Sequence, residues 1–344
     1  MKGLKIVTIV IFLLSCGKEM VPPSPDRWAP KLNYVKSENR RHLTLHFAEP
    51  MDKKSAEDIS NYLCFETISG YTLELISASL KKDTREIDVT TFLQSNIEYT
   101  LVISNIKDVA GNPAAAKKNF KGKIIPDEKP PKIDYTIPAH RTKNFKTGEW
   151  ITVKFLEPMD TVSVRENIFL LPTLMDLKIS YEPGMKSFKF NSDVWEREEL
   201  YTLYIKDFCT DIEGNKLESP LCIALTADSI LPQGCISGEI EVEGEFKKFV
   251  FAIDSLDNIK RIVIVEGIEY EIDLLKPGSY RIVALTDTNG DRSFDLCGEL
   301  KWIEVTDRPE RNKDILLRER KKTEEFERLE SLFLEDADYR RFRQ

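Results

Sequence analysis

The chain has 344 residues, which is long enough for two or three domains. Its 41% hydrophobic and 31% charged residues are typical of a globular protein. The net charge of −8 argues against a nucleic-acid partner. After the first residues, no second apolar segment could span a bilayer, which takes roughly 20 apolar residues.

Residues 1–15 have the pattern of a signal peptide. Lys2 and Lys5 supply a basic start, and residues 6–14 form an apolar run interrupted only by Thr8. The run is too short to span a bilayer stably, because spanning takes roughly 20 apolar residues. We therefore expect this segment to direct export.

Residues 13–16, Leu-Leu-Ser-Cys, end that run and resemble a bacterial lipobox. The resemblance implies cleavage before Cys16 and attachment of acyl chains such as palmitate to that cysteine. Gly17 resembles the outer-membrane sorting pattern of diderm lipoproteins. An ordinary signal peptide followed by an incidental cysteine remains the alternative. The resemblance predicts a lipid-anchored protein of the outer membrane or cell surface, with residues 16–29 as a Pro-rich, extended tether.

Two pairs of motifs then repeat along the chain. Residues 42–52 (HLTLHFAEPMD) match residues 150–160 (WITVKFLEPMD). A second pair follows in the same order: Tyr-Thr-Leu at 99–101 leads to DVAGN at 108–112, and Tyr-Thr-Leu at 201–203 leads to DIEGN at 211–215. Matched motifs at similar spacing indicate a duplicated domain.

The repeats alternate apolar and polar residues, which predicts β-strands with one buried face. Met51 and Met159 follow prolines that should end a strand, and we expect both to fill the core. Gly111 and Gly214 suit turns that need a positive φ. Short strands with regular turn signals predict an all-β fold of tandem sandwiches.

Phe-x-Glu-Pro-Met-Asp followed by Tyr-Thr-Leu and Asp-x-x-Gly-Asn resembles the bacterial Ig-like domain family first described in S-layer proteins. The resemblance implies one Ig-like domain at residues 30–125 and a second at 131–228. A stiff, polar, Pro-rich linker at 126–131 separates them.

Residues 229–318 are also expected to form strands, but the repeat motifs are lost there. Pro277-Gly278 followed by Tyr280 and by a loop rich in Asp, Asn and Gly resembles a small prealbumin-like β-sandwich. That loop offers oxygen ligands and predicts a possible calcium site; a turn that uses these residues for backbone reasons is the alternative. The candidate ligands are Asp287, Asn289, Asp291 and Asp295.

The last segment, residues 319–344, is dense in Glu and Arg and lacks Gly and Pro from residue 323 onward. Phe326, Leu329, Leu332 and Phe333 lie on one helical stripe. We expect a charged C-terminal α-helix that packs on the third domain or frays, with docking to another protein as the alternative.

The remaining cysteines suggest an oxidising compartment. Cys209 could pair with Cys222, and Cys235 could pair with Cys297, although sequence cannot fix the connectivity. Cys64 is left over and is expected to be a buried free thiol.

No catalytic arrangement can be assembled convincingly, so we expect no enzyme. His42 and His46 are about 13 Å apart along one strand, too far to share a metal. A weaker possibility is a cluster of carboxylates at one end of each repeat, called here an acidic pole. In the first repeat Glu49 and Asp52 would approach Asp108. In the second, Glu157 and Asp160 would approach Asp211. Such poles could bind a cation, but turn capping by aspartate is the favoured interpretation.

The sequence thus predicts a non-catalytic cell-envelope lipoprotein whose Ig-like repeats act as a spacer or interaction scaffold. Its expected partners are the membrane, through the lipid anchor, and envelope proteins or surface polysaccharide, but not nucleic acid. The alternative is a carbohydrate-binding accessory lipoprotein that uses exposed rings of Trp150, Trp195 or Trp302. Exposed rings in a line on one sheet face would favour this alternative, and buried indoles would argue against it.

Overall fold

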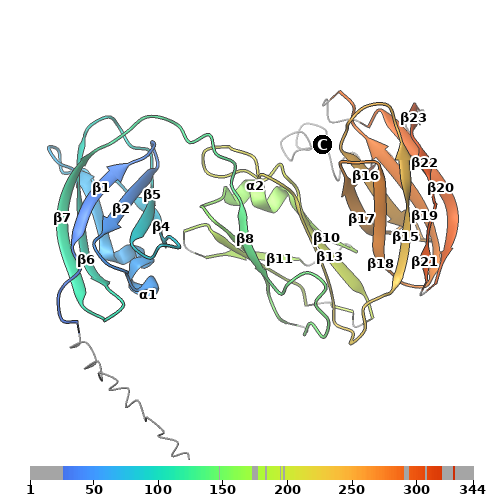
Figure 1. The fold of residues 1–344 in the computed structure, drawn as a ribbon, viewed down its shortest axis with the longest axis horizontal. Helices are drawn as coiled ribbons and strands as arrows, with labels where there is room; N and C mark the ends of the chain where they lie inside the picture. The colour runs from blue at the N-terminus through green and yellow to red at the C-terminus, as the bar shows by residue number, and fades with distance from the viewer. Residues whose placement is uncertain are drawn as a thin grey trace, which may run out of the picture.

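The computed structural model describes residues 26–146, 148–172, 177–182, 184–193, 195–196, 198–289, 294–306, 308–319 and 328–329. Within these ranges the chain forms three β-sandwiches in a row, with the first at one end and the third at the other (Figure 1). The predicted anchor at Cys16 lies outside the described residues. No described helix is long and apolar enough to cross a membrane.

The first sandwich contains two antiparallel sheets and two short helices. One sheet has the order β1 (Leu32–Ser37), β2 (His42–Phe47), β5 (Glu86–Thr91), β4 (Leu75–Leu80). The other has the order β3 (Tyr62–Glu66), β6 (Glu98–Lys107), β7 (Pro113–Lys121). Between β2 and β3 lie α1 (Lys53–Ala56) and a 3-10 turn (Ile59–Asn61).

The second sandwich repeats this topology strand for strand, which confirms the duplication. One sheet has the order β8 (Ile133–Ile137), β9 (Ile151–Phe155), β12 (Ser187–Asn191), β11 (Lys178–Tyr181). The other has the order β10 (Ile168–Leu171), β13 (Leu200–Ile205), β14 (Leu221–Thr226), and α2 (Thr161–Glu166) takes the place of α1.

The third sandwich has a different strand order. One sheet runs β18 (Glu269–Leu275), β15 (Gly234–Glu241), β21 (Pro309–Glu310), with β22 (Ile315–Leu316) also beside β15. The other runs β17 (Ile259–Val265), β16 (Lys248–Ile253), β19 (Gly278–Thr286), β20 (Leu296–Val305), β23 (Arg318–Glu319). Its prealbumin-like affiliation stays a prediction.

The period-two pattern places the expected residues in the cores of the first two sandwiches. Leu43, Leu45 and Phe47 on β2 are fully buried, and β9 presents its equivalent residues in the same way. Met51 and Met159 are buried as predicted, at 1% and 0% exposure. The strands end at Phe47 and Phe155, before the prolines, and each sandwich buries one contiguous apolar cluster.

The second and third sandwiches share a further apolar core. Leu171 and Tyr204, on the outer face of the second sandwich, are buried against Phe249 and Phe251 of the third. Every described residue of β13 is consequently buried, whereas its counterpart β6 keeps exposed positions. Sandwiches two and three are therefore packed as one unit, since burying a large side chain stabilises by roughly 1.5–3 kcal/mol.

The C-terminal segment contributes to this shared core through Leu329, which is 1% exposed. Nearly all of the predicted helix at 319–344 lies outside the described residues. The helix itself therefore stays a prediction.

The Asp-x-x-Gly-Asn turns adopt the expected geometry, with φ of +93° at Gly111 and +90° at Gly214. The third sandwich contains an equivalent turn that the sequence motif did not reveal. Asp254 accepts backbone hydrogen bonds from Leu256 and Asn258, and Asp257 takes the glycine position with φ of +59°. Aspartate is among the few non-glycine residues that tolerate this conformation.

Candidate functional site at the junction of the first two sandwiches

Each of the first two sandwiches binds the backbone of the residue at which its own chain segment begins, through one asparagine. Asn215, the last residue of its turn motif, donates from Nδ2 to the Asp127 carbonyl at 3.0 Å and to the Asp211 carboxylate at 2.9 Å. In the first sandwich, Asn112 contacts Asp26 and Asp108 in the same way, at 3.2 and 2.9 Å. In each sandwich the asparagine of the turn motif thus holds the backbone of the entering aspartate beside the aspartate of the turn.

This arrangement gathers carboxylates at the same pole of both sandwiches. In the first, oxygens of Asp26, Glu49 and Asp108 lie within 4.8 Å of one another. In the second, Asp127 and Glu157 occupy the positions of Asp26 and Glu49. The sequence contains a signal for the entering aspartates that the repeat motifs do not include: Asp26 and Asp127 each stand four residues before a proline, Pro30 and Pro131.

Asp52 and Asp160 are not among the carboxylates gathered at these poles; both are caps, in line with the favoured interpretation of capping by aspartate. Asp52 accepts a hydrogen bond from the Ser55 amide at 2.9 Å and caps α1. Asp160 caps α2 by accepting from the Val162 and Ser163 amides. An aspartate before a helix is held there because its carboxylate satisfies amides that lack an intrahelical partner.

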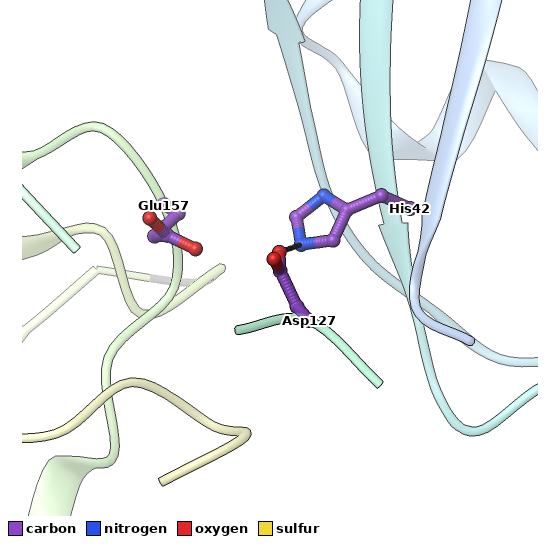
Figure 2. Close-up of side chains that lie close together, drawn as sticks. All are labelled: His42, Asp127 and Glu157. Carbon is purple, nitrogen blue, oxygen red and sulfur yellow. Dashed lines mark ion pairs between the residues drawn. The ribbon is translucent and has the colours of Figure 1, made fainter. Parts of the chain in front are cut away.

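In the second pole a histidine from the first sandwich joins the carboxylates. His42, at the start of β2, has its Nε2 atom 3.5 Å from Asp127 Oδ2 and its Nδ1 atom 3.3 Å from Asp88 Oδ2. Figure 2 shows Glu157 facing this pair from the second sandwich. Ligand atoms of His42, Asp127 and Glu157 all lie within 4.8 Å of one another, close enough to share one metal ion.

The charges at this junction shift two pKa values. Burial alone would lower the pKa of His42, but the hydrogen bond with Asp88 and the neighbouring carboxylates outweigh it and raise the pKa. Burial, followed by the charge of Asp211, raises the pKa of Glu157 to about 7. The site thus concentrates negative charge around an imidazole in a half-buried setting.

Further polar contacts join the two sandwiches around this site. Glu213, in the turn motif of the second sandwich, forms ion pairs with Arg40, at 2.6 Å, and with Arg41. Its side chain is only 2% exposed. Lys186 of the second sandwich donates to Ser79 of the first at 2.7 Å. This junction is therefore ionic, whereas the one between sandwiches two and three is largely apolar.

The predicted calcium loop of the third sandwich is only partly described, because Asp291 lies outside the described residues. Asp287 and Asn289 lie just after β19. The Asp295 carboxylate accepts from the Thr288 amide at 2.8 Å and from the Thr288 hydroxyl at 2.7 Å. These bonds are those of a loop held by a side-chain cap. Calcium binding here stays a prediction.

The expected disulfides are not formed among the described cysteines. Cys209 belongs to the core of the second sandwich, while Cys222 packs on the opposite face against the shared core. Cys297 is buried in that shared core, and Cys235 is a free thiol on β15 of the other sheet. In each expected pair, the two cysteines therefore lie in different parts of the fold and do not face each other. Cys64 is a buried free thiol, as predicted.

The three tryptophans proposed for sugar binding do not form one surface. Trp195 is buried in the second core, where it packs edge-on against Tyr201 and donates to Asn191. Trp150 and Trp302 are 40% and 50% exposed, but they belong to different sandwiches.

Comparison with known proteins identifies the family of the second sandwich. Residues 127–226 match the model of the family described as bacterial Ig-like domain. This match covers less than a third of the chain, and the first sandwich has the same strand order. No curated protein matches the sequence.

Several solved structures resemble the chain weakly. The N-terminal part of the bacterial S-layer protein SbsC is 16% identical with a TM-score of 0.27, and the match covers 58% of this chain and 44% of that one. Domains 1–6 of SbsC are 15% identical with a TM-score of 0.27, and the match covers 81% of this chain and 41% of that one. The MG0-NIE-MG1 domains of Escherichia coli alpha-2-macroglobulin are 8% identical with a TM-score of 0.24, and the match covers 79% of this chain and 96% of that one. The chain spans less than half of the SbsC structures, and these TM-scores support no argument about function.

Proposed function

We propose that this protein, whose second sandwich is a bacterial Ig-like domain, is a non-catalytic cell-envelope lipoprotein. In this proposal the two Ig-like sandwiches are a spacer between a lipid anchor at Cys16 and the third sandwich. The third sandwich, with its C-terminal segment, is the part presented to an envelope partner.

The observation that carries the proposal is the order of the sandwiches and the nature of their junctions. The first sandwich follows the Pro-rich tether, and an ionic junction joins it to the second. An apolar core then joins the second sandwich to the third. A chain built this way holds its far end at a defined distance from its start, which is the mechanical requirement of a spacer.

The histidines support a structural role, because each one has a partner within the fold. His42 pairs with Asp88, and His46 stacks on Tyr34 with ring centroids 5.1 Å apart. His140 accepts a hydrogen bond from the Ala224 amide at 3.1 Å. Histidine is the most frequent general acid–base residue, so its use in structural contacts favours a non-catalytic protein.

A partner surface is available on the third sandwich. A groove of about 810 Å³ runs along β15 and β18. Carboxylates of Glu239, Glu269 and Asp314 line it together with Arg141 and Arg311. Such a mixed charged lining suits a polar protein segment better than an apolar ligand.

The anchor is tested by replacing Cys16 with alanine in the producing bacterium. The wild-type chain should incorporate labelled palmitate and partition into detergent, because two or more acyl chains hold a protein at a membrane. Cys16→Ala should lose both properties, while Cys235→Ala, at a half-buried thiol, should keep them. Detergent partitioning of the Cys16→Ala variant would contradict the anchor.

The carbohydrate-binding alternative has weaker support, because Trp195 is buried and the two exposed indoles lie on different sandwiches. A glycan array separates the two proposals. Saturable binding that Trp150→Ala or Trp302→Ala abolishes would favour the alternative over the scaffold.

A further inference from the structure

We propose that His42, Asp127 and Glu157 form a binding site for a divalent transition metal of the zinc class at the junction of the first two sandwiches. The three residues come from three separate parts of the chain: the start of β2, the linker, and the loop after β9. A metal bound by all three would connect the first sandwich directly to the second. This inference is independent of the proposed anchor and spacer.

The distances suit such a site. His42 Nε2 is 3.5 Å from Asp127 Oδ2, and all three ligand atoms lie within 4.8 Å of one another. In a tetrahedral zinc site with bonds of about 2.0–2.1 Å, ligand atoms stand roughly 3.3 Å apart. Only a small side-chain movement of Glu157 is therefore needed, and Figure 2 shows its carboxyl group directed toward the other two residues.

The imidazole is oriented as it is in many metal sites. Its Nδ1 atom lies 3.3 Å from the Asp88 carboxylate, so Asp88 holds the ring with Nε2 facing Asp127. Histidine ligands of metals commonly donate their other ring N–H to a carboxylate, which fixes the tautomer and raises the basicity of the ligating nitrogen. Asp88 is a positioning residue in this proposal.

The surrounding charges favour a cation. Asp211 adds a third carboxylate close enough to disfavour ionised Glu157. Three positive side chains lie nearby, and each has a partner of its own. Arg40 and Arg41 pair with Glu213. The Lys186 ammonium donates to the Leu156 carbonyl at 2.9 Å and to Ser79 at 2.7 Å. A divalent ion would relieve the repulsion between the carboxylates, because opposite charges stabilise ionised groups.

The first sandwich provides an internal comparison. Asp26, Glu49 and Asp108 form the equivalent pole with oxygen atoms alone. Calcium and magnesium prefer sets of oxygen ligands, whereas an imidazole nitrogen suits zinc, cobalt, nickel and copper. The imidazole of His42 therefore decides the class of metal at the junction.

The proposal is tested with the full chain after treatment with chelator. Calorimetric titration with ZnCl₂ should show one saturable site, and Co²⁺ should give the visible absorption of a tetrahedral complex that zinc displaces. His42→Asn should weaken zinc binding at least 100-fold. Asp88→Asn should weaken it about 10–100-fold, as loss of a carboxylate behind a ligating histidine does. His46→Asn, on the same strand, should bind as the wild type does.

Circular dichroism checks that each variant is folded, and Glu157→Gln gives a second loss of a ligand if His42→Asn is not folded. The proposal is wrong if no saturable zinc binding occurs, or if both His42→Asn and Glu157→Gln bind zinc with wild-type affinity. Displacement of zinc by calcium at comparable concentrations would also overturn it, because that behaviour indicates an all-oxygen site.

Discussion

Arg261 of the third sandwich donates a hydrogen bond to the Thr202 hydroxyl of the second at 2.8 Å, with only 3% of its side chain exposed. The same guanidinium binds the Asp273 carboxylate at 2.9 Å and the Asp273 carbonyl at 3.1 Å. A buried cation thus crosses the boundary between two sandwiches that share an apolar core. Sandwiches two and three are therefore expected to behave as one cooperative unit.

Arg261→Met should destabilise this unit by about 2 kcal/mol, because hydrogen bonds to charged groups contribute about 1.5–3 kcal/mol and Asp273 remains partly solvated. The midpoint of urea unfolding measures the change. Arg308→Met, at an exposed arginine of the same sandwich, is the control and should change stability by less than about 0.5 kcal/mol. Equal midpoints for the two variants would contradict the structural role of Arg261.

Phe251→Ala should destabilise the second sandwich although Phe251 belongs to the third. Phe251 is fully buried in the shared core, and removing a buried phenylalanine typically costs about 3–5 kcal/mol. Trp195 in the second core is the fluorescent reporter, in a chain whose other tryptophans, Trp28, Trp150 and Trp302, are replaced by phenylalanine. The unfolding midpoint measured by Trp195 fluorescence should fall in Phe251→Ala. It should stay unchanged in Phe47→Ala, which leaves a cavity only in the core of the first sandwich. A Trp195 transition insensitive to Phe251→Ala would mean that the two sandwiches unfold independently.

Glu213→Gln should loosen the junction between the first and second sandwiches. The buried carboxylate pairs with Arg40 and Arg41, and losing these charged contacts should cost about 1–3 kcal/mol. Opening of the junction should then rise roughly 5- to 150-fold, and the rate of cleavage after Glu128 in the linker by a glutamate-specific protease measures the change. Glu218→Gln breaks an exposed pair with Lys132 and should leave the cleavage rate unchanged. If both variants are cleaved at the same rate, Glu213 does not hold the junction.

Acid should weaken the third sandwich partly through Asp254. Burial alone would raise the pKa of Asp254, but hydrogen bonds from the Asn258 and Leu256 amides outweigh it and lower the pKa. A lowered pKa means that the folded state binds fewer protons than the unfolded state near the usual value of 3.8. The stabilisation is therefore present above that value and is lost as the pH falls through the folded pKa. The measurement is the unfolding midpoint at pH 5 and at pH 3. Asp254→Asn should lose less stability on acidification than the wild type. An equal loss in both would mean that Asp254 does not contribute to the acid sensitivity.

The sequence predicted the candidate site only in part. Glu157 and Asp211 were expected near one another because repeat motifs bring their loops to one pole. Asp127 carried a readable signal, since its spacing to Pro131 repeats that of Asp26 to Pro30. His42 carried none, because the other two residues of the site, Asp127 and Glu157, come from the linker and from a different sandwich.

The sequence by itself determined the duplicated Ig-like sandwiches, their core residues and their turns, because strand periodicity and turn chemistry act between residues close along the chain. Only the tertiary structure decided how the sandwiches meet. Tyr204 and Cys222 read as outward-facing strand positions until the third sandwich covers them. Likewise, the approach of His42 to Asp127 and Glu157 depends on how two folded bodies are oriented, and no local pattern in either one encodes that orientation.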